Sequence, residues 1–425
     1  MQLEPDARER ALLHQLQAAL DGIAPGRGTL RLGLAVSGGS DSVAMLHLFA
    51  ALSQTRDIAL AVVTVDHGLR PEARQEAAFV AEICARYGLS HECLEWSGWD
   101  GQGNLQAEAR AARYHLLANW AHATQRDWIA LGHTEDDLAE TFLMRLARGS
   151  GLDGLAAMDR QFNRAGAAFF RPLLGASRQD LRLYLTQKGH GWQEDPSNAD
   201  TRFQRVSTRQ VLTGLEPLGL GRAQIANAAR RLSAAKTALQ EFAREHAEKI
   251  VTFQGGDLVI GSADWRATHP ELQRRLMNAM LQWAGDTTYA PRADAVADLD
   301  KKLRSQGRHT LNGCVVSLDA DSLRVAREYN AVSDMVCEAG ALWDGRWLLE
   351  GPGGAEIEVR ALGETGLLAC PNWRDTGLPR RSLIASPAVW TGTELVAAPL
   401  AGLANGWCAR LTRSREQFLS GLLSH

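Results

Sequence analysis

A run of small residues between two apolar segments constrains the fold of this chain more than any other feature. Residues 32–36 are mostly apolar, and apolar positions resume at helical spacing after residue 42. This pattern predicts a strand, a tight loop and a helix. Glycines let the backbone approach closely, hydroxyls donate hydrogen bonds and a helix start offers unpaired N–H groups, so we expect the loop to hold an anion. The loop residues are Ser37, Gly38, Gly39, Ser40, Asp41 and Ser42.

The segments that follow alternate between apolar runs and amphipathic stretches. Strands are expected at 58–65, around 93–96 and at 128–131. Helices are expected at 6–22, 72–87, 105–123, 136–148 and 177–188. Such alternation indicates an α/β fold with a parallel sheet covered on both faces. Ligands bind beyond the carboxyl ends of the strands in these sheets, so the loops after the strands are the informative ones.

Two of those loops carry side chains suited to phosphate binding or acid–base chemistry. His67 and Arg70 follow the second strand and supply a donor and a cation. A solvated turn explains this loop at least as well when it is taken alone. His133, Asp136 and Asp137 follow the fourth strand. Helix capping accounts for one or two of the acidic residues but not for the histidine, which indicates a proton acceptor or a Mg²⁺ ligand.

Arginines gather at two further places. Arg110 and Arg113 are three residues apart on an expected helix, so both can face one ligand. Arg202, Arg205 and Arg209 stand close together beside an aromatic residue, which suits phosphate contact combined with stacking on an unpaired base. An ordinary solvated helix face is the alternative in both places.

Composition limits the classes of function that remain open. A length of 425 residues favours two or three domains. The 46 basic and 49 acidic side chains nearly balance, so the chain has no overall positive field. Any contact with nucleic acid must therefore come from local arginine patches. The 6 cysteines are scattered, so neither a disulfide framework nor a zinc or iron–sulfur site is indicated. No apolar run reaches membrane-spanning length and no signal-peptide pattern opens the chain, so we expect a cytoplasmic enzyme with no membrane partner.

The loop string Ser-Gly-Gly-x-Asp-Ser resembles the PP-loop of the N-type ATP pyrophosphatases, which split ATP into AMP and pyrophosphate. Further strings narrow the resemblance to the tRNA(Ile)-lysidine synthase family, and the likeness is strong over about residues 30–212. These strings are His-Gly-Leu-Arg at 67–70, Ala-Arg-x-x-Arg-Tyr at 109–114, His-Thr-x-Asp-Asp-x-x-Glu-Thr at 133–141, Arg-Gly-Ser-Gly at 148–151, Arg-Pro-Leu-Leu at 171–174 and Glu-Asp-Pro-Ser-Asn at 194–198.

The resemblance implies a ligase that converts the wobble cytidine of a CAU-anticodon isoleucine tRNA into lysidine, with ATP and free L-lysine as co-substrates. The C2 oxygen of the cytidine attacks the α-phosphorus of ATP and pyrophosphate leaves. The ε-amine of lysine then attacks C2, and AMP departs. The partners are thus the tRNA and L-lysine, while the oligomeric state stays open, with a homodimer as one alternative.

The resemblance also implies a role for each candidate residue. Loop 37–42, His67 and Arg70 would bind ATP, and Asp41 would help to hold Mg²⁺ beside the phosphates. The catalytic group would be Asp41, His133, Asp136 and Asp137, although the sequence does not decide which carboxylate receives the proton of the lysine amine. Contacts to the tRNA would come from Arg110, Arg113, Arg202, Arg205 and Arg209.

Three domains are expected along the chain. A PP-loop ATP pyrophosphatase domain covers 1–215, a small and mainly helical tRNA-binding domain covers 216–330, and a β-rich C-terminal domain that helps to recognise the tRNA covers 335–425. Candidate tRNA contacts in the last domain are Arg360, Arg374, Arg380 and Arg381.

Other interpretations stay open at this point. One is a different PP-loop enzyme that activates its substrate with a nucleotide, of the tRNA thiolase or amidotransferase type. The other is a non-catalytic module that senses ATP, which would leave the acidic cluster at 133–141 without an explanation.

Overall fold

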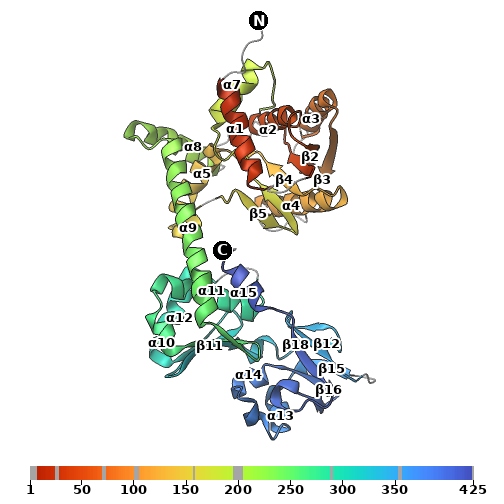
Figure 1. Ribbon diagram of the computed structural model, residues 1–425, viewed down its shortest axis with the longest axis vertical. Coiled ribbons are helices and arrows are strands. Elements are labelled where there is room, and N and C mark those ends of the chain that lie inside the picture. The colour runs from red at the N-terminus through yellow and green to blue at the C-terminus, as the bar shows by residue number, and fades with distance from the viewer. Residues whose placement is uncertain are drawn as a thin grey trace. The chain divides into compact units, whose positions relative to one another are not determined.

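The computed structural model describes residues 7–23, 28–68, 73–99, 105–156, 158–194, 204–287, 291–352 and 357–423. By its internal contacts the chain divides into two compact units, Met1–Lys236 and Thr237–His425 (Figure 1). Within the described ranges, no helix is both long enough and apolar enough to cross a membrane.

The first unit is built on a six-stranded sheet of order β3-β2-β1-β4-β6-β5. Strands β1 to β4 and β6 run parallel, and β5 pairs antiparallel with β6 at one edge. The predicted parallel sheet is therefore confirmed. The strands are β1 (Leu30–Ala35), β2 (Ile58–Asp66), β3 (Ser90–Glu95), β4 (Trp128–Leu131), β5 (Gln161–Arg164) and β6 (Ala167–Phe170).

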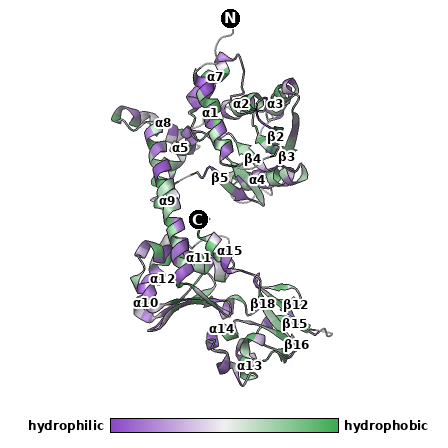
Figure 2. Cartoon of the chain, in the orientation of Figure 1, coloured by the Kyte–Doolittle hydropathy of each residue, from purple (hydrophilic) through white to green (hydrophobic). Residues whose placement is uncertain are grey.

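Helices fill the connections between the strands, as the alternating pattern predicts. All five helices expected in this region are present, with ends that shift by one or two residues. Bands of hydrophobic and hydrophilic residues alternate along α1, as expected for a helix with one face on a core (Figure 2). The helices are α1 (Ala7–Asp21), α2 (Ser40–Leu52), α3 (Ala73–Tyr87), α4 (Leu105–Ala123), α5 (Glu135–Leu146), α6 (Leu152–Leu155), α7 (Arg178–Gln187) and α8 (Gln204–Leu215).

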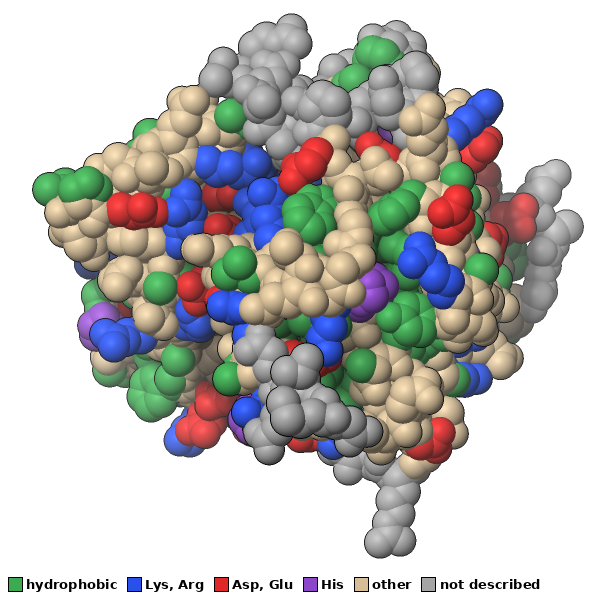
Figure 3. All heavy atoms as spheres, turned by 90° about the horizontal axis from the view of Figure 1, so that it is seen from above, with side chains coloured by type: hydrophobic (Ala, Val, Ile, Leu, Met, Phe, Trp, Pro, Cys, Tyr) green, Lys and Arg blue, Asp and Glu red, His purple; other side chains and the backbone are tan. Residues whose placement is uncertain are grey.

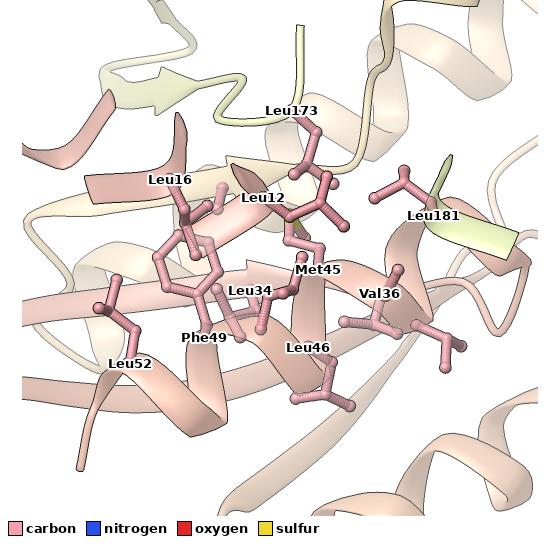
Figure 4. Close-up of a cluster of buried hydrophobic side chains, with 14 of the residues drawn as sticks. Leu12, Leu16, Leu34, Val36, Met45, Leu46, Phe49, Leu52, Leu173 and Leu181 are labelled. Atoms are coloured by element: carbon pink, nitrogen blue, oxygen red, sulfur yellow. The ribbon is translucent and has the colours of Figure 1, made fainter. Parts of the chain in front are cut away.

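Alternation of side chains along β1 explains why the sheet is covered on both faces. Leu34 and Val36 point into a core that also contains Leu16 of α1, Phe49 of α2 and Leu181 of α7 (Figure 4). On the opposite face α4 packs close to the strand. A Cβ added at Gly33 would lie 2.5 Å from Cζ3 of Trp120, so only glycine fits below that ring.

The sequence did not predict the β5–β6 hairpin. Each of its strands has four residues, and β5 is mostly exposed, so it shows no apolar run long enough to identify a strand. Strand β3 begins three residues earlier than expected for a similar reason, because it lies at the sheet edge and buries little surface.

Helix α9 (Arg222–Ile250) contains the boundary between the units. In the second unit, α10 (Ser262–Ala267), α11 (Pro270–Gly285) and α12 (Ala293–Gln306) pack against an antiparallel sheet of order β7-β8-β11-β10-β9. Its strands are β7 (Thr252–Gln254), β8 (Asp257–Gly261), β9 (Arg308–Leu311), β10 (Cys314–Leu318) and β11 (Ser322–Arg327).

This sheet adds β-structure to a region where mainly helices were expected. Its strands are only three to six residues long, too short for an apolar run to identify them in the sequence. The boundary expected near residue 330 stays a prediction. Beyond it lie two small antiparallel sheets, of order β12-β15-β16-β17 and β13-β14-β18, as expected for a β-rich segment.

The strands of these two sheets are β12 (Val336–Glu338), β13 (Leu342–Trp343), β14 (Trp347–Glu350), β15 (Ile357–Ala361), β16 (Pro387–Thr391), β17 (Glu394–Ala397) and β18 (Cys408–Leu411). The accompanying helices are α13 (Gly363–Leu368), α14 (Arg380–Ile384) and α15 (Arg415–Gly421).

Candidate active site

A cavity of about 720 Å³ opens at the carboxyl ends of β1, β2 and β4, where ligands of parallel sheets bind. Its wall is formed by the loop after β1, the tips of β2 and β4, the first turn of α3, one arginine each of α4 and α8, two arginines of α7 and residues 193–194. Of the predicted site residues it contains Ser37, Gly39, Ser40, Asp41, Ser42, His67, Arg113, His133, Asp137 and Arg209.

The loop after β1 is shaped by its own small residues. Gly38 adopts a φ of +89°, which a side chain would strain, and its carbonyl accepts a hydrogen bond from the N–H of Gln193 at 2.9 Å. The hydroxyl of Ser42 accepts from the N–H of Ser37 at 3.1 Å and donates to the carbonyl of Gly39 at 3.0 Å. Gly39 is the N-cap residue of α2, and a glycine has no side chain to cap the first turn. The N–H groups of that turn are therefore available to an anionic ligand.

The tip of β4 approaches this loop closely. A Cβ at Gly132 would lie 3.0 Å from Cα and 3.2 Å from N of Ser42, so glycine is required for the two segments to meet. This contact brings the fourth strand, with His133 directly after it, against the start of α2. Two motifs that are 92 residues apart, at Asp41 and His133, thus line one cavity.

Asp41 is bound on both of its carboxylate oxygens. Oδ1 accepts from the Ser40 hydroxyl at 3.1 Å, and Oδ2 accepts from Nε of Arg178 at 2.9 Å. Burial raises the pKa of the Asp41 carboxyl, and Arg178 opposes that shift. Arg178 therefore favours the ionised form of Asp41 at the helix start, where phosphates are expected.

Arg178 also contacts the carboxylates of the fourth-strand motif. Its Nη1 lies 3.4 Å from Oε1 of Glu140, and its Nη2 lies 3.5 Å from Oδ1 of Asp137. Burial alone would lower the pKa of this guanidinium, but Asp41, Asp137 and Glu140 together raise it. The sequence did not single out Arg178. A signal was present, since an arginine in the first turn of a helix opposes the helix dipole and needs acidic partners.

Glu140 is the most buried carboxylate of this group, with 1 % of its side chain exposed. Its Oε1 accepts from Nε of Arg209 at 2.6 Å, and Nε of Arg205 lies 4.0 Å from Oε2. Two of the predicted tRNA-binding arginines thus lie beside one buried acid, and Arg209 also lines the cavity.

Asp136 and Asp137 are adjacent in sequence but differ in position. Asp137 lines the cavity and closes a capping box with the N–H and hydroxyl of Thr134 at 2.9 and 3.0 Å. Burial opposes its ionisation, yet the pKa of Asp137 is lowered, because His133, when protonated, and the cations Arg178 and Arg205 stabilise the carboxylate. Asp136 instead accepts from the backbone N–H of Arg178 at 2.8 Å and lies 3.3 Å from Nε of Arg222, outside the cavity wall. This position favours a structural role for Asp136.

His133 and His67 line the cavity from β4 and β2. Burial lowers the pKa of His133 to about 3, with Arg171, Arg113 and Arg205 acting in the same direction against Asp137, so the ring is neutral at ordinary pH. Burial also lowers the pKa of His67, helped by Arg113.

The remaining predicted residues are more dispersed. Arg113 reaches the cavity, whereas Arg110 is exposed and lies over the Tyr114 ring at 5.5 Å, so the two do not both line it. Arg70 and Arg202 lie outside the described residues. The described ranges contain no group of three or more His, Cys, Asp or Glu that could hold a metal by itself. Mg²⁺ binds through one or two carboxylates plus the phosphates of a nucleotide, so the Asp41 carboxylate would need a bound nucleotide to complete such a site.

Comparison with known proteins identifies the family of this chain. The family model of the PP-loop domain matches residues 10–215. A tRNA(Ile)-lysidine synthase of Ruegeria pomeroyi is 47% identical over 93% of this chain and 94% of its own length. One from Rhizobium meliloti is 34% identical over 88% of this chain and 84% of its own, and one from Wolbachia pipientis is 30% identical over 75% and 76%. At this identity and coverage, the chain belongs to the tRNA(Ile)-lysidine synthase family.

Proposed function

We propose that the protein joins lysine to C2 of the wobble cytidine in the CAU anticodon of isoleucine tRNA, in two steps that share one cavity. The observation that carries the proposal is the meeting of the phosphate loop at Ser37–Ser42 with His133 and Asp137 at the carboxyl ends of β1 and β4. A nucleotide held at the loop has its α-phosphorus within reach of a base placed against the second motif.

In the first step the loop binds the departing pyrophosphate through its hydroxyls and the start of α2. Attack by the C2 oxygen on the α-phosphorus converts a poor leaving group into AMP. Asp41 is the residue that would hold Mg²⁺, which neutralises charge on the phosphates when it is bound. Arg178 keeps Asp41 oriented toward the loop.

In the second step the ε-amine of lysine attacks C2 and AMP leaves. We assign orientation of this amine to Asp137, because its carboxylate lines the cavity and its lowered pKa keeps it ionised. A carboxylate beside the ammonium group holds it near C2 until the ammonium has passed its proton to solvent and the neutral amine can attack. Arg205 and Arg209 are placed to hold the anticodon loop, since both lie at the edge of the acidic group.

The rival interpretations make different demands on the cavity. A thiolase needs cysteines at the reacting centre, and no cysteine occurs in the described wall of the cavity. An ATP-sensing module needs no acid at the second motif, whereas Asp137 and Glu140 of that motif are buried beside Arg178. A cytoplasmic location and a homodimer stay predictions.

Incubation of the purified protein with ATP, lysine and an isoleucine tRNA of CAU anticodon tests the proposal. We expect AMP and pyrophosphate, and lysidine in the digested tRNA by mass spectrometry. A methionine tRNA with the same anticodon serves as the control. Formation of AMP without tRNA, or turnover with ammonia in place of lysine, would rule the assignment out.

A further inference from the structure

Arg171 stands directly behind His133, on the side away from the cavity. His133 is part of the cavity wall and Arg171 is not. The Nε–H of Arg171 donates to Nδ1 of His133 at 3.2 Å, and only 7 % of Arg171 is exposed. Arg171 begins the Arg-Pro-Leu-Leu string, to which the reaction as described gives no role.

The β5–β6 hairpin holds Arg171 in this position. The Arg171 N–H donates to the carbonyl of Arg160 at 2.8 Å, and Nη1 donates to the carbonyl of Asp159. The guanidinium carbon lies 4.1 Å from the centroid of the Phe162 ring, which is a cation–π contact. The donor that reaches His133 is thus fixed by three neighbours.

The direction of this hydrogen bond determines where the histidine proton lies. A guanidinium can only donate, so Nδ1 must present its lone pair and a neutral ring carries its proton on Nε2. The charged groups facing the ring are Asp137 from α5, Arg113 from α4, Arg205 from α8 and Arg171 itself. Among the described residues none is hydrogen-bonded to Nε2, which leaves that N–H to a ligand in the cavity.

We propose that Arg171 is a positioning residue that fixes His133 as the Nε2–H tautomer, so that His133 donates a hydrogen bond to an oxygen of the bound substrate and does not accept a proton. The inference rests on the proposed function, because it assigns His133 its part in that reaction. The acceptor is an oxygen, either of a phosphoryl group of ATP or of the cytidine C2 carbonyl. A donor at a phosphoryl oxygen stabilises the negative charge that builds up there as the C2 oxygen attacks, whereas a donor at the C2 oxygen only positions the base before the attack.

Nitrogen-15 NMR of the histidine rings tests the tautomer in the intact protein without any turnover. The His133 signal is assigned by its absence in His133→Asn. We expect the Nε2–H form in the wild type, and an Nδ1–H signal would overturn the proposal. A shift of Nε2 with a non-hydrolysable ATP analogue alone identifies a phosphoryl acceptor, and a shift that also requires tRNA identifies the base. No shift in either case would contradict the donor role.

A matched pair of variants separates the hydrogen bond from packing. In Arg171→Gln the side-chain amide nitrogen is the same number of bonds from the backbone as Nε of the arginine, so a donor remains. In Arg171→Met the side chain is as long as that of glutamine but has no hydrogen-bond donor. Both lose the guanidinium charge. We expect kcat for AMP formation to fall about 10- to 100-fold in Arg171→Met, with partial recovery in Arg171→Gln and little change in KM for ATP. Equal kcat in the two folded variants would contradict the positioning role of Arg171. Failure of the proposed function would be recognised separately, because the wild-type protein itself would then be inactive.

Discussion

Asp41 is a residue whose charge and shape can be separated by one substitution. In Asp41→Asn the side chain keeps its size and one oxygen acceptor but loses the charge expected to face Mg²⁺ and the phosphates. We expect kcat for AMP formation to fall by about 100-fold or more. The melting temperature should change little, because Arg178 retains Asp137 and Glu140 as partners. Normal turnover in the folded variant would remove this role.

Arg205 differs from the other arginines around Glu140 in being the least tightly held. Its side chain is 41 % exposed and its Nε lies 4.0 Å from the carboxylate. We expect Arg205→Ala to raise KM for tRNA while KM for ATP stays near its wild-type value. The slope of log KM against log salt should fall by about 1, as for one lost phosphate contact. Arg31→Ala, at the opposite end of β1, is the control. An unchanged salt slope would contradict the assignment.

His47 makes the stability of the first unit depend on pH. The ring is buried, stacks on His190 at 3.6 Å and contacts the Tyr87 hydroxyl at 2.8 Å. Burial lowers its pKa to about 4, so between about pH 6.5 and 4 the unfolded chain binds a proton that the folded chain does not.

The free energy of unfolding should therefore fall on acidification through this range, by about 1.4 kcal/mol per pH unit for this residue. His133, whose pKa is also lowered, adds to the same trend. Urea unfolding of the wild type and His47→Phe across these pH values measures the difference. We expect a shallower slope in the variant, whereas His14→Gln, at an exposed position, should match the wild type.

At the scale of elements, the sequence predicted what depends on local patterns. Apolar runs identified β1, β2 and β4, and the small residues 37–42 identified the loop between β1 and α2. What it missed depends on contacts between distant segments. Arg178 acquires its role only when α7 packs beside α2, and the β5–β6 hairpin is defined by pairing along an edge of the sheet. For Arg178, the only local signal was its position in the first turn of a helix.

The contact between the β4 tip and the phosphate loop can be tested with one added side chain. In Gly132→Val the Cβ would lie 3.0 Å from the backbone of Ser42, which cannot move without moving the loop. We expect ATP affinity to fall more than about tenfold, with loss of part of the unit's thermal stability. Gly191→Ala is the matched control, because a Cβ there meets no atom within 4 Å. Wild-type ATP binding by Gly132→Val would show that the loop does not depend on this approach.

At the scale of the whole molecule, net charge limits how tRNA can be bound. The formal charge is −3, so a general positive field does not attract the nucleic acid. Seen from above, Figure 3 shows basic and acidic side chains gathered beside one another rather than a patch of one sign. Affinity must therefore come from individual arginines, and each should contribute separately to the dependence on salt.

The arginines of the second unit allow that expectation to be tested on residues that do not line the cavity. Arg374 and Arg381 are exposed, whereas Arg380 beside them is already paired with Glu364. If the second unit helps to bind the tRNA, the double variant Arg374→Gln/Arg381→Gln should raise KM for tRNA and lower the salt slope by about 2, with ATP binding unchanged. Arg380→Gln should have a smaller effect, because its charge is compensated before tRNA arrives. Equal effects of Arg380→Gln and the double variant, or none from either, would mean that this surface does not contact the tRNA backbone.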